Sequence, residues 1–273
     1  MNLLFCINSN FVWLWKRCMQ SILLNGGAGY YQVFILHSDL THQDTEEISD
    51  FLGDRGRVCF IPVSDDIFEG FPETRRYPRQ IYYRIAAPSL LPKELDRILY
   101  LDVDLVVINS LVPFYHSDFE QAGFLACSHS QKWLDKVNQL RLGIEKDVPY
   151  LNSGVMLINL SEQSNPLALS RVKQYTSQYR RRLILPDQDI ITALAGDMVK
   201  LADTMKYNLN DRILTWHNLD PASPKIDLDW VRKYGVIIHY FGKNKPWKPH
   251  YRGCLDVFYH EVDATLSSSP SQP

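Results

Sequence analysis

The chain has 273 residues, enough for one large α/β domain or two small ones with a sizeable core. Its formal net charge is −2, so the overall charge favours neither nucleic acid nor an anionic membrane as a partner. The five cysteines are odd in number and lack CxxC spacing, which argues against a zinc cluster or a disulfide framework and favours free thiols in a reducing compartment.

The chain ends and the hydropathy predict where the protein resides. The N-terminus has no basic region and only a short apolar run, unlike a signal peptide. No stretch approaches the roughly 20 apolar residues that span a bilayer. We therefore expect a cytoplasmic protein without a transmembrane segment, whose last residues from Ser267 form a loose Ser/Pro-rich tail.

Short apolar runs alternate with helical patterns along the chain. Asn10 is a candidate helix cap, and the glycine pair at 26–27 is a stop signal. Thr41 opens a second helix with a Thr-x-x-Asp pattern. In chain order we predict strand 3–7, helix 10–24, strand 32–37, helix 41–52, strand 57–63, helix 79–91 ending near Pro88 or Pro92, strand 97–107, strand 154–159, helix 188–194 and strand 236–240.

This alternation indicates an α/β fold with a mostly parallel central sheet covered by helices on both faces. No internal repeat or interdomain linker is visible, so we expect one domain over residues 1–252 and a short C-terminal segment over 253–273. In such sheets the ligand lies beyond the carboxyl ends of the strands.

One predicted strand runs directly into Asp102-Val103-Asp104. Alternate residues of a strand point to the same side, so both carboxylates can face one site while Val103 points to the core. Paired carboxylates repel each other unless a cation lies between them, and oxygen ligands suit Mg²⁺, Mn²⁺ or Ca²⁺. The tripeptide alone is equally consistent with an acidic strand end that faces solvent.

The same residues also fit the Asp-x-Asp-x-Val motif of haloacid-dehalogenase-like phosphatases. Asp102 would then attack a phosphoryl group, and Asp104 would be the acid/base. That motif normally opens a chain, whereas 101 residues precede it here. The downstream acidic motif is absent as well, because the nearest match, at 196–203, has one residue too many.

Further segments accompany the paired aspartates in a fixed order: Asn8-Ser9-Asn10, Arg84 within Tyr82-Tyr83-Arg84-Ile85, Tyr150 to Asn159, Pro186-Asp187-Gln188-Asp189, and His239-Tyr-Phe-Gly242-Lys-Asn-Lys245-Pro246-Trp247. With them the chain resembles the retaining family-eight glycosyltransferases, a group that contains bacterial lipooligosaccharide galactosyl- and glucosyltransferases and glycogenin. The resemblance runs from residue 3 to about residue 250.

The resemblance implies a nucleotide-sugar-binding domain of GT-A type. It implies retaining transfer of galactose or glucose from a UDP-sugar to a hydroxyl of a glycan, glycolipid or glycoprotein, with Mn²⁺, or Mg²⁺, as cofactor. The implied metal ligands are Asp102, Asp104 and His239. The implied catalytic residues are Gln188, Asp187, Asn152 and Arg84. The implied nucleotide contacts are Cys6, Asn8, Asn10, Arg84, Asp102, Val103, Asp104, Gly242 and Lys245.

Gln188 bears on the mechanism that the resemblance implies. Double displacement needs a carboxylate beneath the anomeric carbon, and an amide oxygen is a poor nucleophile. Transfer on the front face is therefore favoured, although the neighbouring Asp187 and Asp189 keep double displacement open. Lys245 has no obvious partner without a diphosphate, so residues 239–252 are expected to close over bound UDP.

The chain also departs from the family pattern. Asn8 stands where many members have Asp, the segment 128–132 lacks an acidic residue that some members direct at the acceptor, and Phe241 adds bulk on that side. The acceptor is therefore expected to differ. Few basic and aromatic residues follow residue 242, so any membrane contact is weak and peripheral. A degenerate binding or scaffold member would have lost a metal ligand, whereas all three are present.

Overall fold

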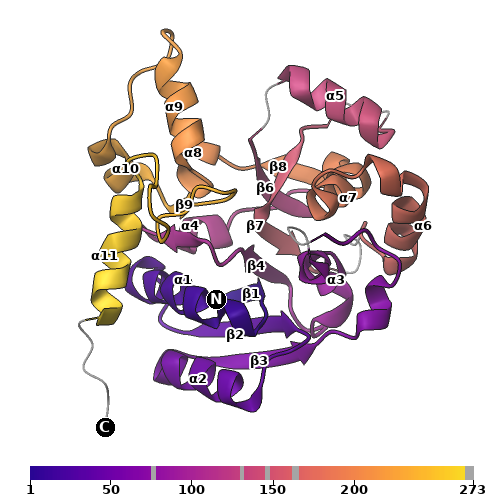
Figure 1. Ribbon diagram of the computed structural model, residues 1–273, viewed down its shortest axis with the longest axis horizontal. Helices are drawn as coiled ribbons and strands as arrows, with labels where there is room; N and C mark the ends of the chain where they lie inside the picture. Colours follow the sequence, from indigo (N-terminus) through magenta and orange to yellow (C-terminus); the bar gives the residue numbers. More distant parts are fainter. Residues whose placement is uncertain (75–77, 130–131, 145–147, 162–165, 268–273) are drawn as a thin grey trace.

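The computed structural model describes residues 1–74, 78–129, 132–144, 148–161 and 166–267. Most of the predicted C-terminal tail lies outside these residues, as do residues 130–131 of the segment 128–132. In the described part, a seven-stranded sheet has the order β3-β2-β1-β4-β7-β6-β8, and β5 pairs with β9 beside it (Figure 1). The strands are β1 Asn2–Cys6, β2 Tyr31–His37, β3 Gly56–Pro62, β4 Arg97–Leu101, β5 Leu105–Val107, β6 Phe124–Ser128, β7 Leu151–Asn159, β8 Val199–Leu201 and β9 Ile237–His239.

The central sheet is mostly parallel, as the sequence predicts. Strands β3, β2, β1 and β4 run parallel to one another, and β8 runs parallel to β6. Only β7 is antiparallel to both strands that flank it. The parallel half places the ends of β1 and β4 side by side, and these ends precede the segments that carry Asn8 and Asp102.

Helices cover both faces of the sheet. Leu3 and Phe5 of β1 pack on one face with α1 and α2, whereas Leu4 packs on the other face with α3, α6 and α7. The strands are apolar at successive positions because both of their faces are buried. The helices are α1 Val12–Asn25, α2 His42–Leu52, α3 Tyr83–Leu90, α4 Val112–Tyr115, α5 Lys132–Leu142, α6 Leu169–Tyr179, α7 Pro186–Ala195, α8 Thr204–Tyr207, α9 Asp211–Leu219, α10 Leu228–Tyr234 and α11 Asp256–Ser267.

The helix starts confirm one predicted cap and correct another. Thr41 and Asp44 form the predicted capping box of α2. Asn10 does not cap α1, because a short 3₁₀ turn, Ser9–Phe11, precedes that helix and Asn8 caps this turn. The Asn8 side chain accepts a hydrogen bond from the amide of Asn10 at 3.1 Å.

One further expectation is wrong. Residues 97–107 do not form one strand, since the chain leaves the central sheet after Leu101 and continues as β5, which pairs with β9 in a second sheet.

Of the two predicted helix ends, the one near Pro92 is confirmed, because α3 ends at Leu90 and Pro88 lies inside it. Proline has no amide N–H, so Pro88 cannot donate the helical hydrogen bond to the carbonyl oxygen of Arg84. The neighbouring Ala86 and Ala87 are fully buried, and this packing holds the helix in place.

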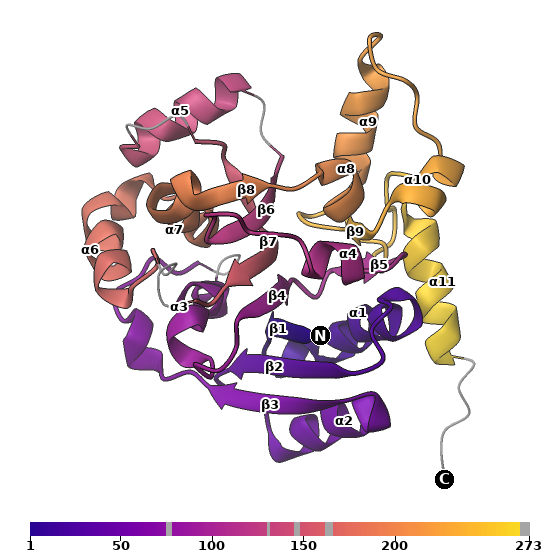
Figure 2. The same ribbon diagram turned by 180° about the vertical axis from the view of Figure 1, so that it is seen from behind.

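The C-terminal helices form a second layer around β5 and β9. Val106 and Ile238 of these strands pack with Leu214 of α9 and Phe258 of α11. Figure 2 shows α11 running alongside α1, and the Arg17 side chain holds Asp263 at 2.6 Å there. None of the helices in the described ranges is long and apolar enough to cross a membrane.

Candidate functional site

The segment Asp102–Asp104 connects the two sheets. The amide of Asp102 donates to the carbonyl oxygen of Gly154 on β7 at 2.8 Å, and the carbonyl oxygen of Asp104 accepts from the amide of Tyr240 at 2.8 Å. The chain bends between these anchors. The two carboxylates therefore approach each other because the chain turns from one sheet to the other, and not because strand residues alternate. The site still lies at the carboxyl end of β4, as predicted.

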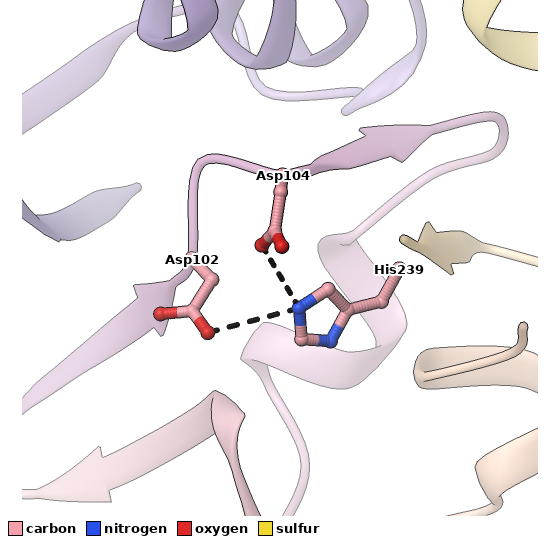
Figure 3. Close-up of side chains that lie close together, drawn as sticks. All are labelled: Asp102, Asp104 and His239. Atoms are coloured by element: carbon pink, nitrogen blue, oxygen red, sulfur yellow. Dashed lines mark hydrogen bonds and ion pairs between the residues drawn. The ribbon is translucent and has the colours of Figure 1, made fainter. Parts of the chain in front are cut away.

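Asp102, Asp104 and His239 converge on one point (Figure 3). His239 Nε2 lies 3.1 Å from Asp104 Oδ1 and 3.7 Å from Asp102 Oδ2, and one ligand atom of each residue lies within 4.8 Å of the others. Burial opposes ionisation of Asp104, but the positive charge and hydrogen bond of Lys245 outweigh it and hold the pKa of this carboxyl well below its usual range.

The hydrogen bonds of His239 leave one ring nitrogen for a cation. Nδ1 lies 2.8 Å from Oδ1 of the fully buried Asn208, whose own amide nitrogen donates to Asn152 Oδ1 at 2.8 Å. Asn208 Oδ1 must then accept, so the network assigns the proton of the neutral ring to Nδ1. The Nε2 lone pair faces two carboxylates, and a divalent cation relieves that repulsion. The donor set of two oxygens and one nitrogen fits Mn²⁺ or Mg²⁺.

Gly154 makes this approach possible. A Cβ atom at this position would lie 2.2 Å from His239 Cε1 and 2.6 Å from Asp102 Oδ2. Real side chains do not approach that closely, so only glycine leaves room for the imidazole beside the carboxylate. Sequence reasoning placed Gly154 in a matching segment but gave it no role.

Arg84 joins Asp102 to the segment around Asp187, and we call Arg84, Asp102, Ser153 and Asp187 the Arg84 network. Arg84 Nη2 lies 2.9 Å from Asp102 Oδ1, and Nη1 lies 3.3 Å from Asp187 Oδ2. Ser153 Oγ donates to Asp187 Oδ2 at 2.9 Å. Arg84 is 8% exposed, so this charge is neutralised inside the protein. Burial would lower its pKa, but Asp102, Tyr100 and Asp187 together raise it.

The predicted sugar-contacting residues lie next to this network. Asn152 Nδ2 donates to Gln188 Oε1 at 3.5 Å, while Asn152 Oδ1 accepts from the amide of Gly154 at 3.1 Å. Burial raises the pKa of Asp187, although Arg84 and the Ser153 hydroxyl counteract this shift. Asp187 lies within the first turn of α7, which begins at Pro186, two residues before the predicted start.

Asp189 has a different role from Asp187. It is fully buried, accepts two hydrogen bonds from Arg141 at 2.7 and 2.8 Å, and accepts a third from the Tyr150 hydroxyl at 2.5 Å. The amides of Ile184 and Leu185 donate to its second oxygen at 2.6 and 3.1 Å. Asp189 therefore anchors the start of α7, and its carboxylate has no free face for a nucleophilic role.

The N-terminal residues of the predicted site lie at the end of β1. Cys6 lies beside Tyr100 and Arg84, and burial raises the pKa of its thiol. Asn8 and Asn10 belong to the 3₁₀ turn, and the neighbouring Ser9 hydroxyl donates to Asp44 Oδ2 of α2 at 2.7 Å. This bond fixes the turn at the carboxyl edge of the sheet. Nothing here assigns a ligand to these side chains.

Lys245 has partners in this structure, contrary to expectation. Its ammonium group contacts Asp104 Oδ2 and donates to the carbonyl oxygen of Tyr240 at 2.7 Å. Gly242 has a φ of 89° with open space where a Cβ would be, so it allows the chain to turn back toward the carboxylates. The cation of Lys245 thus lies beside the metal-ligand group, where it can also meet an anionic ligand.

The structure thus brings the predicted metal ligands, Arg84, Asp187, Asn152 and Lys245 into one connected site. Sequence reasoning missed the roles of Asn208, Tyr100, Ser153 and Gly154. The Tyr100 hydroxyl donates to Asp102 Oδ1 at 2.6 Å. For Tyr100 the signal was its place two residues before Asp102, whereas Asn208 has no local signal, because only the fold brings it to His239.

The comparisons with known proteins identify the family of the chain. Residues 2–250 match the family described as glycosyl transferase family 8. The lipopolysaccharide glucosyltransferase WaaO of Escherichia coli is 25% identical over 233 residues, covering 82% of this chain and 66% of that protein. The lipopolysaccharide 1,3-galactosyltransferase of Salmonella typhimurium is 21% identical over 276 residues, covering 98% of this chain and 78% of that protein. The chain therefore spans just under two thirds of the length of the Escherichia coli relative.

The fold has a close counterpart among solved structures. The galactosyltransferase LgtC, in complex with donor and acceptor sugar analogs, matches with a TM-score of 0.81 at 22% identity, covering 99% of this chain and 98% of that chain. This likeness confirms the GT-A fold. Since the family match extends over most of the chain, the protein belongs to glycosyl transferase family 8.

Proposed function

We propose that this chain is a retaining hexosyltransferase that moves galactose or glucose from a UDP-sugar to a hydroxyl of a glycan, glycolipid or glycoprotein. The observation that carries the proposal is the group of Asp102, Asp104 and His239, with Nε2 of the imidazole directed at both carboxylates. Family membership and the names of the lipopolysaccharide glucosyl- and galactosyltransferase relatives support the same activity. Such acceptors would be met on the cytoplasmic side, with at most peripheral membrane contact.

A divalent cation held by these three side chains would act as a Lewis acid toward the leaving diphosphate. Lys245 supplies a second positive charge at the same place, since its ammonium group already lies against Asp104. Arg84 orients Asp102 and Asp187 from the interior. The protein therefore keeps its carboxylates close together without a large rearrangement when the donor binds.

The sugar would lie against Asp187, Asn152 and Gln188. In front-face transfer, the acceptor oxygen forms its bond to the anomeric carbon on the side from which UDP leaves, and the hydroxyl proton passes to a phosphate oxygen. Asp189 is saturated by Arg141, Tyr150 and backbone amides, so it supports no double displacement. Asp187 already shares one oxygen between Arg84 and Ser153.

The phosphatase alternative finds no support in this geometry. Asp102 Oδ1 accepts from the Tyr100 hydroxyl at 2.6 Å and pairs with Arg84 at 2.9 Å, which makes it a weak nucleophile. A scaffold role would leave the arrangement of three intact ligands and their supporting Asn208 unexplained.

The metal and the donor are tested together by measuring UDP release. The assay uses UDP-galactose, UDP-glucose and their N-acetyl forms, with Mn²⁺, Mg²⁺ or EDTA. We expect turnover of a hexose donor with Mn²⁺, less with Mg²⁺ and none with EDTA. Asp104→Asn should lower the rate by more than about 100-fold. Substituting a residue that only orients a metal ligand already lowers metal affinity or activity by about 10- to 100-fold, and Asp104 is a proposed ligand itself.

The matched control is Asp54→Asn, which removes the same charge from an exposed position after α2. It should keep full activity, and both variants should keep the circular dichroism of the native fold. Full turnover in EDTA would refute the metal assignment.

Retention is tested by NMR of the new anomeric proton, which should show an α-linked product from the α-linked donor. Gln188→Ala should slow transfer while UDP affinity stays nearly unchanged, because the proposed place of Gln188 is beneath the sugar and away from the diphosphate. A β-linked product would contradict the retaining assignment. A collapse of UDP binding in Gln188→Ala would show that its role is wrong.

A further inference from the structure

A stack of rings and one guanidinium leads outward from the metal-ligand group. His239 lies 5.2 Å from the ring of Phe241, and Phe241 stacks on His129 at 4.8 Å with an interplanar angle of 17°. The guanidinium carbon of Arg212 lies 5.2 Å from the centre of the Phe241 ring and 5.1 Å from that of Trp216. We call His129, Phe241, Arg212 and Trp216 the Arg212 stack.

Arg212 carries a positive charge that the structure leaves without an anionic partner. Its guanidinium makes no hydrogen bond or ion pair with any residue in the described ranges, in contrast to Arg84 and Arg141. The neighbouring Asp211 is committed elsewhere, because it accepts from the amides of Cys254 and Leu255 at 2.7 and 3.2 Å and from the Tyr251 hydroxyl. Arg212 is exposed overall, so water reaches its guanidinium in the free protein, while partial burial against the rings lowers its pKa.

The other members of the stack are neutral. Burial lowers the pKa of His129 to about 3, so its imidazole is uncharged at neutral pH. His129 Nε2 donates to the carbonyl oxygen of Asn208 at 2.9 Å, which fixes the ring plane. Arg212 is thus the single cation of the stack, and Trp216 beside it is 42% exposed, so its ring offers apolar surface next to that cation.

This combination matches a sugar that bears an acidic group. The C–H faces of a pyranose ring pack on aromatic rings, and a guanidinium held by aromatic faces keeps its N–H edge for a phosphate or carboxylate. An acceptor that covers Arg212 displaces the water that reaches its guanidinium, so a neutral acceptor would leave the cation unpaired and dehydrated. Phe241 follows His239 by two residues, so a sugar on the stack lies next to the metal-ligand group.

We propose that the Arg212 stack is an acceptor subsite selective for glycans with an anionic group, a phosphate or a carboxylate, and that Arg212 binds this group. The inference rests on the proposed transferase function, because it names the class of acceptor for that reaction. Arg212 acts on binding and specificity, whereas Asp102, Asp104 and His239 act on the donor.

The test uses acceptor sets in which only the charge differs: methyl α-glucoside and methyl α-galactoside, each beside its 6-phosphate and its 6-uronate. Equilibrium binding is measured by protein-detected NMR with UDP and Mg²⁺ present, and transfer is measured with Mn²⁺ and the donor. We expect an anionic member to bind about 10- to 100-fold more tightly than its neutral counterpart, the usual worth of a hydrogen bond to a charged group. The member with the larger ratio identifies phosphate or carboxylate as the natural group.

Arg212→Gln should bring this ratio close to one, with neutral-sugar binding and acceptor-free UDP release unchanged. Arg212→Lys should restore part of the ratio, since it keeps the charge but loses the planar fork. The matched control, Arg57→Gln, removes an exposed arginine from the edge strand β3 and should leave the ratio intact.

The proposal is overturned if no anionic sugar binds more tightly than its neutral counterpart, or if Arg212→Gln weakens both alike. Acceptor-free UDP release distinguishes a failure of the proposed subsite from a failure of the proposed transferase function. Release with no preference for anionic sugars refutes the subsite alone, whereas no release from any donor refutes the transferase function while the binding data still decide the subsite.

Discussion

The two sides of the metal-ligand group differ in how completely their polar atoms are paired. On the Arg84 network, a buried cation is shared between Asp102 and Asp187, and Ser153 adds a further bond. On the Arg212 stack, aromatic rings replace carboxylates, and the cation has no anionic partner in the described ranges. The difference indicates that the first side is organised before any ligand arrives, whereas the second depends on the ligand to complete its charge pairing.

Asn208 connects the two sides. Its side chain bonds to His239 and Asn152, and its carbonyl oxygen accepts from His129. A change in one region can therefore reach the other through the fully buried Asn208 as well as through the contact of His239 with Phe241. Substitutions that alter one side alone provide the sharpest tests of the contrast.

The largest effect is expected for Gly154→Ala, which disturbs the metal ligands on the side of the Arg84 network. The new Cβ would lie 2.2 Å from His239 Cε1, so the imidazole must move away from the carboxylates. Mn²⁺ affinity, measured by calorimetry, should fall by more than about 10-fold, and overpacking should lower the free energy of unfolding in urea by about 1–3 kcal/mol. The control Gly29→Ala has nothing within 4 Å of its Cβ and should change neither quantity. Native Mn²⁺ affinity in Gly154→Ala would refute the crowded geometry.

A smaller effect is expected for Asn208→Ala, which tests the connection. The Nδ1–H of His239 loses its acceptor, so the ring is no longer held with Nε2 toward the carboxylates. We expect Mn²⁺ affinity to fall by about 10-fold, at the low end of effects for groups that orient a ligand. Asn218→Ala is the control, because its side chain also makes two hydrogen bonds, to the backbone of Ile226 at 2.7 and 2.8 Å, but neither of them involves a metal ligand. Equal losses in both variants would show that Asn208 acts only through general stability.

The smallest effect is expected for Asp44→Asn, which loosens the turn that carries Asn8 and Asn10. The amide of Thr41 and the hydroxyl of Ser9 lower the pKa of Asp44 from its usual 3.8 in the folded state. The ionised carboxylate therefore stabilises the fold above pH 3.8, and this contribution is lost as the pH falls through the folded-state pKa. Because Asp44 lies near the surface, we expect a loss of about 0.5–1 kcal/mol at neutral pH.

Urea unfolding of Asp44→Asn at several pH values checks this sign. The difference from the wild type should be constant near neutrality and should vanish in acid. Asp50→Asn, on the same helix but exposed in its last turn, serves as the control and should show no such difference. A difference that grows in acid would contradict the assignment.

The local sequence was sufficient for much of the fold. The strand β1 is predictable because Leu3, Leu4 and Phe5 are apolar at successive positions, the pattern of a strand with two buried faces. The start of α2 is predictable because the capping box of Thr41 and Asp44 involves only neighbouring residues. The break after Leu101 was not visible, since residues 105–107 are as apolar as a continuous strand. Their pairing with β9, which lies more than 130 residues later in the chain, removes them from the central sheet.

For the site, the sequence determined the residue types and the tertiary structure decided their roles. The Asp-x-Asp pair alone was equally consistent with a metal site and with an acidic strand end, and only the resemblance to the family added His239 and predicted a metal site. Asp187 and Asp189 look alike in sequence. In the structure, Asp187 pairs with Arg84 and stays in the site, whereas Asp189 pairs with Arg141 and anchors the start of α7. Asn208 and Arg212 carry no local signal at all. Their roles arise from contacts between distant segments, and such contacts depend on how the whole core packs.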